Sequence, residues 1–241
     1  MRYGIFADVH GNLPALKAVL RALQSENPDQ YLCVGDIVGY GANPQECLDL
    51  VGNIEAISVA GNHEWGVLDK IDLDDFNDLA REALVWTQRH ISREARDFLS
   101  HLDPTFKNKD LAMVHSTLPY PERFEYLTNF DQLVSMFPFV ETPVCFVGHT
   151  HVPKIYVEEG SQIYEAASFK IEMASSARYI VNVGSIGQPR DGNPRAAYCV
   201  YSVEEKTIAV QRVEYDILES QRRIREAGLP DFLAWRLAWG I

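Results

Sequence analysis

The sequence has few of the features that mark membrane, secreted or nucleic-acid-binding proteins. No apolar run approaches the roughly 18 residues that cross a bilayer, and Asp8 interrupts the first apolar run too early for a signal peptide. There are only four cysteines and no C-x-x-C spacing, which favours buried, reduced thiols. The 22 Lys and Arg are outnumbered by 34 Asp and Glu, for a formal net charge of −12, and form no basic stripe. We therefore expect a cytoplasmic protein that binds no membrane and no long nucleic acid.

The rest of the composition is that of an ordinary globular protein, with 46% hydrophobic and 23% charged residues. Apolar runs at 2–8, 31–34 and 55–59 predict strands, and helical patterns alternate with them from Leu13 and over 43–51. This alternation predicts an α/β fold, with helices on the faces of a sheet. Later patterns predict a helical segment at 74–102, strands at 111–115 and 144–147, hairpin strands at 154–158, 162–169, 179–183, 196–202 and 207–213, and helices at 216–227 and 231–239. We expect one domain over 1–241, with a helical segment, 65–102, beside the functional site and a C-terminal helical tail, 215–241.

Polar side chains follow the predicted strands at the points where each strand ends. Five of the seven histidines lie in these loops, whose candidate residues are Asp8, His10, Asp36, Asn62, His63, His115, His149 and His151. In open sheets, ligands bind just beyond the carboxyl ends of the strands. The mixture of carboxylate, imidazole and amide suits Mn²⁺, Fe²⁺, Zn²⁺, Co²⁺ or Ni²⁺ better than Mg²⁺ alone.

The local spacing of these residues supports a common site. In Asp8-x-His10 and His149-x-His151, two side chains would lie on the same side of an extended segment. The glycines before Asp36, Asn62 and His149 permit sharp turns and a close approach of the ligand to the backbone.

The motifs Asp8-x-His10, Gly35-Asp36, Gly61-Asn62-His63-Glu64, an isolated His115 and Gly148-His149-Thr150-His151 resemble, in this order, those of the calcineurin-like metallophosphoesterase superfamily. They span residues 8–151 and are most similar to its small prokaryotic phosphodiesterase and phosphoesterase branch. The resemblance implies a four-layer αββα sandwich of two mixed β-sheets flanked by helices, with a dinuclear metal site at the sheet ends. It assigns Asp8, His10 and His151 to one metal, Asn62, His115 and His149 to the other, and Asp36 to both. It further implies attack by a metal-bridging hydroxide, with His63 as general acid or electrostatic stabiliser.

The absence of two arginines narrows the range of expected substrates. Phosphoprotein phosphatases and symmetrical diadenosine tetraphosphatases carry one arginine soon after the bridging aspartate and another just before Gly-Asn-His, whereas here the segments are 35–41, GDIVGYG, and 60–63, AGNH. We therefore expect hydrolysis of phosphodiesters or small phosphate esters, nucleotides included. A dinucleoside polyphosphate hydrolase or a protein phosphatase-like enzyme is the alternative. A non-catalytic scaffold or nucleotide-binding regulator is disfavoured because all seven ligands and His63 are present.

Three residues are candidates for contacts with the substrate. The segment 182–192 is rich in glycine and polar residues, and Arg190, or else Arg195, is a candidate for binding a non-reacting part of the substrate. The alternative for Arg190 is a pair with Asp191 that only orders the loop. Asn12 either caps the first helix or binds phosphate, with capping favoured.

The aromatic residues leave similar alternatives open. The segment 65–102 and the loop 116–128 are expected to wall the pocket, and the candidates for stacking on a base, or else for core packing, are Trp65, Tyr120 and Phe169. Trp235 and Trp239 are expected in the core or at a subunit contact, which leaves a homo-oligomer open.

Overall fold

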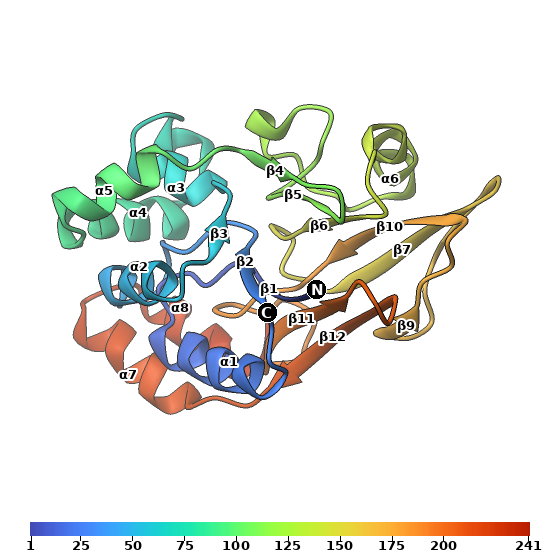
Figure 1. The fold of residues 1–241 in the computed structure, drawn as a ribbon. Helices are drawn as coiled ribbons and strands as arrows, with labels where there is room; N and C mark the ends of the chain where they lie inside the picture. The colour runs from blue at the N-terminus through green and yellow to red at the C-terminus, as the bar shows by residue number, and fades with distance from the viewer.

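Two mixed β-sheets of six strands each form the centre of the structure, a computed structural model that describes every residue from Met1 to Ile241 (Figure 1). The first sheet has the order β3-β2-β1-β11-β12-β9 and the second the order β4-β5-β6-β10-β7-β8. The strands of the first sheet are β1 (Arg2–Phe6), β2 (Gln30–Cys33), β3 (Ile57–Ser58), β9 (Lys170–Glu172), β11 (Ala196–Ser202) and β12 (Thr207–Val213). Those of the second are β4 (Thr105–Lys107), β5 (Ala112–Val114), β6 (Val144–Val147), β7 (Lys154–Glu159), β8 (Gln162–Glu165) and β10 (Ala177–Asn182).

Alternation along the strands creates the layers, because successive side chains point to opposite faces of a sheet. Ile5 packs between the two sheets, in a cluster with Phe146 of the second sheet. Its neighbour Phe6 points outward, into a cluster with the buried side of the first helix. On the outer face of the second sheet, Cys145 packs against Leu133 of the sixth helix. The structure therefore confirms the four-layer sandwich.

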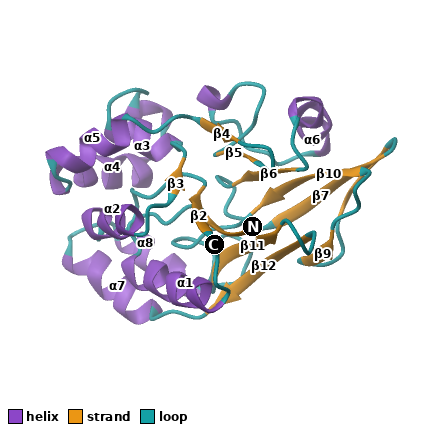
Figure 2. Ribbon diagram, in the orientation of Figure 1, coloured by secondary structure: helices purple, strands orange, loops and turns teal.

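Most helices cover the first sheet, and one covers the second (Figure 2). The helices are α1 (Leu13–Ser25), α2 (Pro44–Asn53), α3 (Asn62–Val67), α4 (Asp78–His90), α5 (Arg93–Ser100), α6 (Phe130–Met136), α7 (Ile217–Glu226) and α8 (Asp231–Trp235). Four single 3₁₀ turns lie at Leu73–Asp75, Pro121–Arg123, Phe137–Phe139 and Arg236–Ala238. In Figure 1, α6 lies across the sandwich from α1. No helix has the length and apolar character needed to cross a bilayer.

Parallel strands bring the ligand-bearing loops to one edge of the sandwich. In the first sheet β1, β2 and β3 are parallel, with Phe6 opposite Cys33 and Leu32 opposite Ile57. In the second sheet β5, β6 and β10 are parallel, with Asn182 opposite Val147. Because parallel strands end at the same edge, the loops that follow them meet there.

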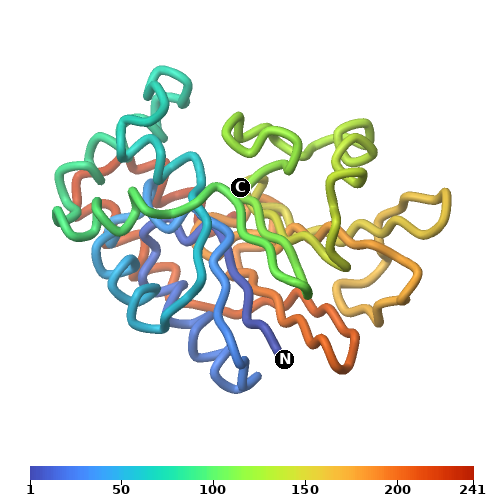
Figure 3. The backbone as a smooth tube through the Cα atoms, turned by 45° about the horizontal axis from the view of Figure 1, so that its top comes forward, coloured from blue at the N-terminus to red at the C-terminus, as the bar shows by residue number.

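The C-terminal tail packs beside the helical segment of residues 65–102. Leu233 and Leu237 join a buried cluster with Ala80 and Ala83 of α4 and with Tyr40, which follows β2. The indole nitrogen of Trp86 donates to the carbonyl of Ala227 at 3.1 Å. Figure 3 shows the tail, in red, behind the cyan and green helices of that segment. The tail therefore supports the loop that carries Tyr40.

Several element boundaries differ from the prediction. The segment 74–102 contains two helices, because α4 ends at the extended residue Ile91 and the side chain of Ser92 caps α5 through the Ala95 amide. The first strand ends at Phe6, two residues before Asp8. The short elements α3, α6, β4 and β9 had no clear periodic signal, since each has at most seven residues.

Candidate metal centre and substrate pocket

All the predicted metal-binding side chains and the predicted catalytic histidine lie together at this edge: Asp8 and His10 after β1, Asp36 after β2, Asn62 and His63 at the start of α3, His115 after β5, and His149 and His151 after β6. Ligand atoms within 4.8 Å of one another form three groups, which are Asp8, His10 and His151; His10, Asp36 and His63; and Asp36, His115 and His149. All eight side chains are buried except Asn62, which is partly buried. The first group contains the three side chains that the resemblance assigns to one metal, and the third contains Asp36, His115 and His149 of the other set without Asn62. Asp36 Oδ2 also lies 3.7 Å from His10 Nε2 of the first group.

The backbone at these ligands is strained. The φ angle is positive at five of them, which are Asp8 (52°), His10 (48°), Asp36 (54°), His149 (66°) and His151 (60°). Such angles are uncommon outside glycine and cost about 1–3 kcal/mol each. The prediction that the two D/H-x-H pairs lie on extended chain is therefore wrong, and both pairs lie in turns beyond their strands. Hydrogen bonds between loops hold these turns, such as the one from the His10 amide to the Asp36 carbonyl at 3.0 Å.

Backbone carbonyls orient three of the imidazoles. The Nδ1 atoms donate to carbonyl oxygens in three pairs, His10 to Val38 at 3.0 Å, His115 to Val34 at 2.7 Å and His151 to Gln188 at 2.6 Å. A carbonyl only accepts, so each Nδ1 carries the proton. In a neutral ring the other nitrogen, Nε2, is then a bare lone pair that faces the cluster.

Several of these lone pairs have no proton donor. The Nε2 atoms of His10 and His151 lie 3.0 Å apart, an arrangement that is repulsive unless a positive charge lies beside both. Nε2 of His149 and Oδ1 of Asn62 are buried without a hydrogen-bond partner, whereas Nε2 of His115 lies 3.2 Å from Asp36 Oδ2. Buried polar atoms are rarely left unpaired. This donor set, of two carboxylates, imidazoles and one amide, fits divalent cations of borderline hardness.

Burial and neighbouring charges determine the protonation of the cluster. Burial lowers the pKa of His10, His149 and His151, which keeps these rings neutral and able to bind a cation. Burial would also lower the pKa of His115, but the carboxylates of Asp36 and Asp8 raise it to about 10. Burial disfavours an ionised Asp36, yet His115 and His63 hold its pKa well below the usual range. Asp36 is thus ionised, as a metal ligand must be.

Glu64 is a supporting residue that the sequence interpretation did not assign. Its buried carboxylate accepts four backbone N–H groups, those of Asp36 (2.8 Å), Ile37 (2.8 Å), Val38 (3.3 Å) and Gly61 (2.8 Å). It therefore ties the Asp36 loop to the start of α3. A side chain at Gly61 would overlap the Asp36 carboxylate, so the close approach of these two loops also requires glycine at position 61. The sequence signal for this supporting role was the position of Glu64 directly after Gly61-Asn62-His63.

His63 lies at the inner end of the substrate pocket. Its backbone N–H donates to Asp36 Oδ1 at 2.9 Å, and its Nε2 lies 4.0 Å from Asp36 Oδ2. Tyr40 and Phe76 pack against its ring, with centroids 4.7 and 5.5 Å away. Nδ1 has no partner, and Gly39, with φ of +85°, leaves room for this edge of the ring.

A cavity of about 410 Å³ opens above the cluster. Its floor includes Asp36, Asn62, His63, His149 and His151, and its walls are Tyr40, Ile71, Asp75, Phe76, Asn77, Glu122, Arg123, Phe124, Tyr126 and Arg190. Both segments expected to wall the pocket, 65–102 and 116–128, contribute to it. The expected stacking residues do not: Trp65 packs on Phe124, while Tyr120 and Phe169 are exposed elsewhere. The aromatic wall consists of Tyr40, Phe76, Phe124 and Tyr126, which had no distinguishing sequence signal.

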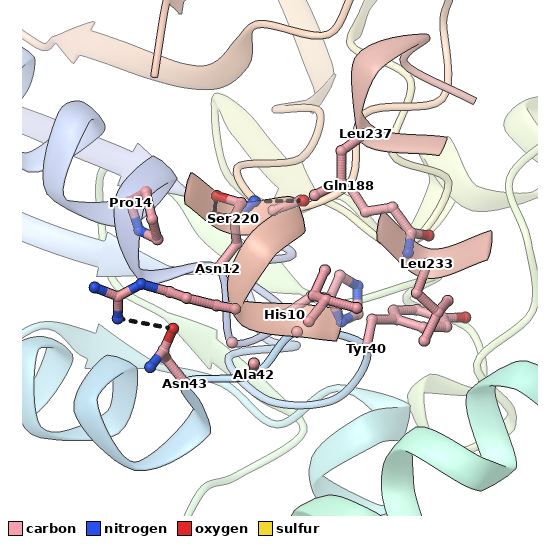
Figure 4. A pocket seen from close by; sticks show the side chains of 15 residues that line it. His10, Asn12, Pro14, Tyr40, Ala42, Asn43, Gln188, Ser220, Leu233 and Leu237 are labelled. Carbon is pink, nitrogen blue, oxygen red and sulfur yellow. Dashed lines mark hydrogen bonds between the residues drawn. The ribbon is translucent and has the colours of Figure 1, made fainter. Parts of the chain in front are cut away.

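The other two candidate contacts lie outside this cavity. Asn12 caps α1, because its Oδ1 accepts from the Ala15 amide at 3.2 Å and from the Ser220 hydroxyl at 2.8 Å. Its Nδ2 donates to the Gly187 carbonyl at 3.0 Å, so Asn12 joins α1 to the loop 184–192. Figure 4 shows Asn12 beside Ser220, in a small separate pocket. Arg195 is exposed and donates to the Asn193 side chain at 3.1 Å.

A sandwich of this kind with a buried Asp–His cluster at the shared edge of its sheets defines a metal-dependent phosphoesterase. The chain belongs to the calcineurin-like phosphoesterase superfamily, whose domain model matches residues 1–206. The protein is therefore a hydrolase of phosphoester bonds, in a family that depends on metal ions.

Two solved structures and one further protein cover nearly the whole chain. An uncharacterized protein of Methanocaldococcus jannaschii is 38% identical over 240 residues, which are 98% of this chain and 97% of that protein. A metallophosphoesterase from Sphaerobacter thermophilus is 39% identical, with a TM-score of 0.87 over 100% of this chain and 99% of that one. A hypothetical protein from Pyrococcus horikoshii is 20% identical, with a TM-score of 0.81 over 100% and 98%, a likeness of fold alone.

Proposed function

We propose that this protein hydrolyses phosphodiesters or small phosphate esters, nucleotides included, at a centre of two divalent cations. Asp8, His10 and His151 would hold one cation, Asn62, His115 and His149 the other, and Asp36 both. The observation that supports this most strongly is the pair of facing Nε2 lone pairs of His10 and His151, 3.0 Å apart in a buried site. Bound cations would satisfy these lone pairs and the unpartnered atoms of His149 and Asn62.

The cations, when bound, supply positive charge to the phosphoryl oxygens and lower the pKa of a water nucleophile. Manganese, iron, zinc, cobalt and nickel all suit the donor set.

The protein's own side chains would then orient the substrate and supply a proton. His63 is not needed as a ligand, and its ring borders the cavity beside Asp36. It would donate a proton to the leaving oxygen, or a hydrogen bond to a phosphoryl oxygen. Tyr40 and Phe76 hold this ring in place and restrict water beside it.

A test of this function uses bis-p-nitrophenyl phosphate with Mn²⁺. The purified protein should release p-nitrophenolate, and Asp36→Asn and His151→Ala should each lose at least about 100-fold in kcat/KM because the ligand set is broken. The matched controls are Asp49→Asn and His101→Ala, two exposed residues remote from the cluster, which should leave turnover unchanged. A folded, metal-loaded wild-type protein that hydrolyses no mono- or diester in a broad panel would favour a scaffold or a nucleotide-binding regulator instead.

A further inference from the structure

Arg190 is an arginine in the substrate cavity with no acidic partner. The chain has 34 acidic residues, yet no ion pair in the structure includes Arg190. The alternative considered for Arg190, a pair with Asp191, does not occur, because Asp191 forms a hydrogen-bonded ion pair with Arg212. A partly buried cation that lacks a counter-ion in so acidic a protein favours binding of an external anion.

Neutral groups hold the guanidinium in place without neutralising it. Its Nε and Nη2 donate to Gln188 Oε1, at 3.2 and 2.8 Å, and Nη2 reaches the Tyr40 hydroxyl at 3.5 Å. The guanidinium carbon lies 5.8 Å from the centre of the Tyr40 ring. Gln188 is buried, and its own carbonyl accepts from His151. One edge of the guanidinium is thus fixed, while Nη1 donates neither to Gln188 nor to Tyr40 and is available to a ligand.

Arg190 lies beside the metal cluster and not within it. It lines the same cavity as Asp36, His63 and His149, but it makes no hydrogen bond to a predicted ligand. Tyr126 lines the same cavity, and its ring stacks on His149 with centroids 3.9 Å apart. Desolvation raises the pKa of the Tyr126 hydroxyl, and the positive charge of Arg190, together with a hydrogen bond from it, lowers this pKa in part. The guanidinium therefore lies near Tyr40 and Tyr126, in the cavity that the cluster also lines.

The charges farther out restrict where a second anion can lie. Asp75 and Glu122 are exposed residues on the cavity lining, and they would repel a phosphate at the mouth. Arg123 is also exposed, and its guanidinium stacks on Tyr120, 4.2 Å from the ring centre. An additional phosphate is therefore best placed at Arg190, next to the cluster.

We propose that Arg190 binds a phosphate of the substrate that is not attacked, so that the preferred substrates carry a second phosphate beside the scissile one. This inference rests on the proposed function. The reacting phosphoryl group would lie at the cluster, and Arg190 is a fixed positive charge that lines the same cavity. Phe76, Phe124 and Tyr126 then provide the apolar surface for an organic group. Nucleoside diphosphates and longer polyphosphates combine these features.

Two phosphonates test the binding directly, because their carbon–phosphorus bonds are not hydrolysed. Methylenediphosphonate has two phosphonate groups and methylphosphonate has one, and calorimetry with the Mn²⁺-loaded protein measures each Kd. In Arg190→Ala, methylenediphosphonate should bind about 10- to 100-fold more weakly, the loss expected for one charge-assisted contact. Methylphosphonate should weaken far less. Arg190→Lys should recover part of the lost affinity for methylenediphosphonate, since lysine keeps the positive charge but cannot make the bidentate hydrogen bonds of a guanidinium.

Arg195→Ala is the matched control, an exposed arginine on the same loop that should leave both constants unchanged. Thermal unfolding and metal content would verify that each variant is folded and loaded. Kinetics of ADP against AMP should show the same discrimination, with Arg190→Ala losing far more kcat/KM on ADP. Equal losses for both phosphonates would place Arg190 on the reacting phosphoryl group, and no loss for either would exclude a phosphate contact; each overturns the proposal. Absence of turnover on every ester, with the phosphonate difference intact, would instead contradict only the proposed function.

Discussion

At the scale of single residues, the site depends on two conditions. Some backbone positions lie so close to a side chain of the site that only glycine fits, and some buried polar groups must meet a fixed set of hydrogen-bond partners. Gly39 illustrates the first condition, because it has φ of +85° and lies against the edge of the His63 ring. Glu64 illustrates the second, because one carboxylate serves four backbone donors. Neither residue lines the cavity, yet both determine where Asp36 and His63 lie.

The substitution Gly39→Ala should displace His63. The new methyl group would overlap the imidazole edge, and the left-handed backbone adds about 1 kcal/mol of strain. We expect a loss of kcat on bis-p-nitrophenyl phosphate of at least about tenfold, with metal content retained. Gly192→Ala is the control, because Gly192 has a similar φ of +78° and open space around it. Equal kinetic losses in the two variants would show that backbone strain alone, and not His63, is responsible.

The substitution Glu64→Gln should weaken both the fold and the metal centre. A glutamine has one acceptor oxygen and places an NH₂ group against backbone N–H donors, so we expect a loss of about 2–4 kcal/mol in the free energy of unfolding. Misplacement of Asp36 should also weaken metal affinity about tenfold or more. Urea denaturation and metal titration measure these effects. Glu82→Gln, at an exposed position of α4, should change neither, and an unaltered Glu64→Gln protein would refute the supporting role.

At the scale of elements, short parallel strands place the ligands and the C-terminal helices support one wall of the pocket. The ends of β1, β2, β5 and β6 carry most of the ligands, whereas α7 and α8 contact the cluster around Tyr40 and α4. Tyr40 in turn contacts His10, His63 and Arg190. The tail therefore supports the site through Tyr40 and, by way of Ser220, through Asn12.

The substitution Leu233→Ala should destabilise this support. Leu233 is 1% exposed in the cluster that contains Tyr40, so its truncation should cost about 2–5 kcal/mol in the free energy of unfolding. Urea denaturation measures the change. Leu218→Ala is the control, because Leu218 is 77% exposed on α7 and its loss should cost less than about 0.5 kcal/mol. Similar small losses in both variants would mean that the tail contributes little to the fold.

At the scale of the whole molecule, the fold and the ligand loops were largely predictable, while the precise geometry was not. Polar side chains at strand ends are visible in a sequence because apolar residues precede them, as at Asp8 and Asp36. The left-handed backbone at His151 has no such signal, because tertiary hydrogen bonds impose it. The pairing of Asp191 with Arg212 could not be predicted either, since Asp191 lies in a loop and its partner lies 21 residues further along the chain, on β12. Because the sequence does not show that Asp191 pairs with Arg212, it also does not show that Arg190 lacks an acidic partner.

Removal of metal should lower the stability of the molecule. Without cations the cluster retains facing lone pairs and two buried carboxylates, whereas ligands bound only by the folded state stabilise it, by about 2.7 kcal/mol at 100 times Kd. We expect chelation to lower the thermal unfolding midpoint by about 5–10 °C, and Mn²⁺ to restore it. Circular dichroism measures the midpoint, and a value insensitive to chelator would indicate that the cluster holds no cation tightly.

The central claim is that the Asp–His cluster is a dinuclear centre for phosphoester hydrolysis. The most direct measurement is turnover of bis-p-nitrophenyl phosphate by the chelated protein as Mn²⁺ is added, with bound metal counted per chain. Our account predicts that turnover is absent at first, rises with occupancy and reaches a plateau at two ions per chain. Turnover that is independent of added metal, or no turnover when both ions are bound, would contradict it.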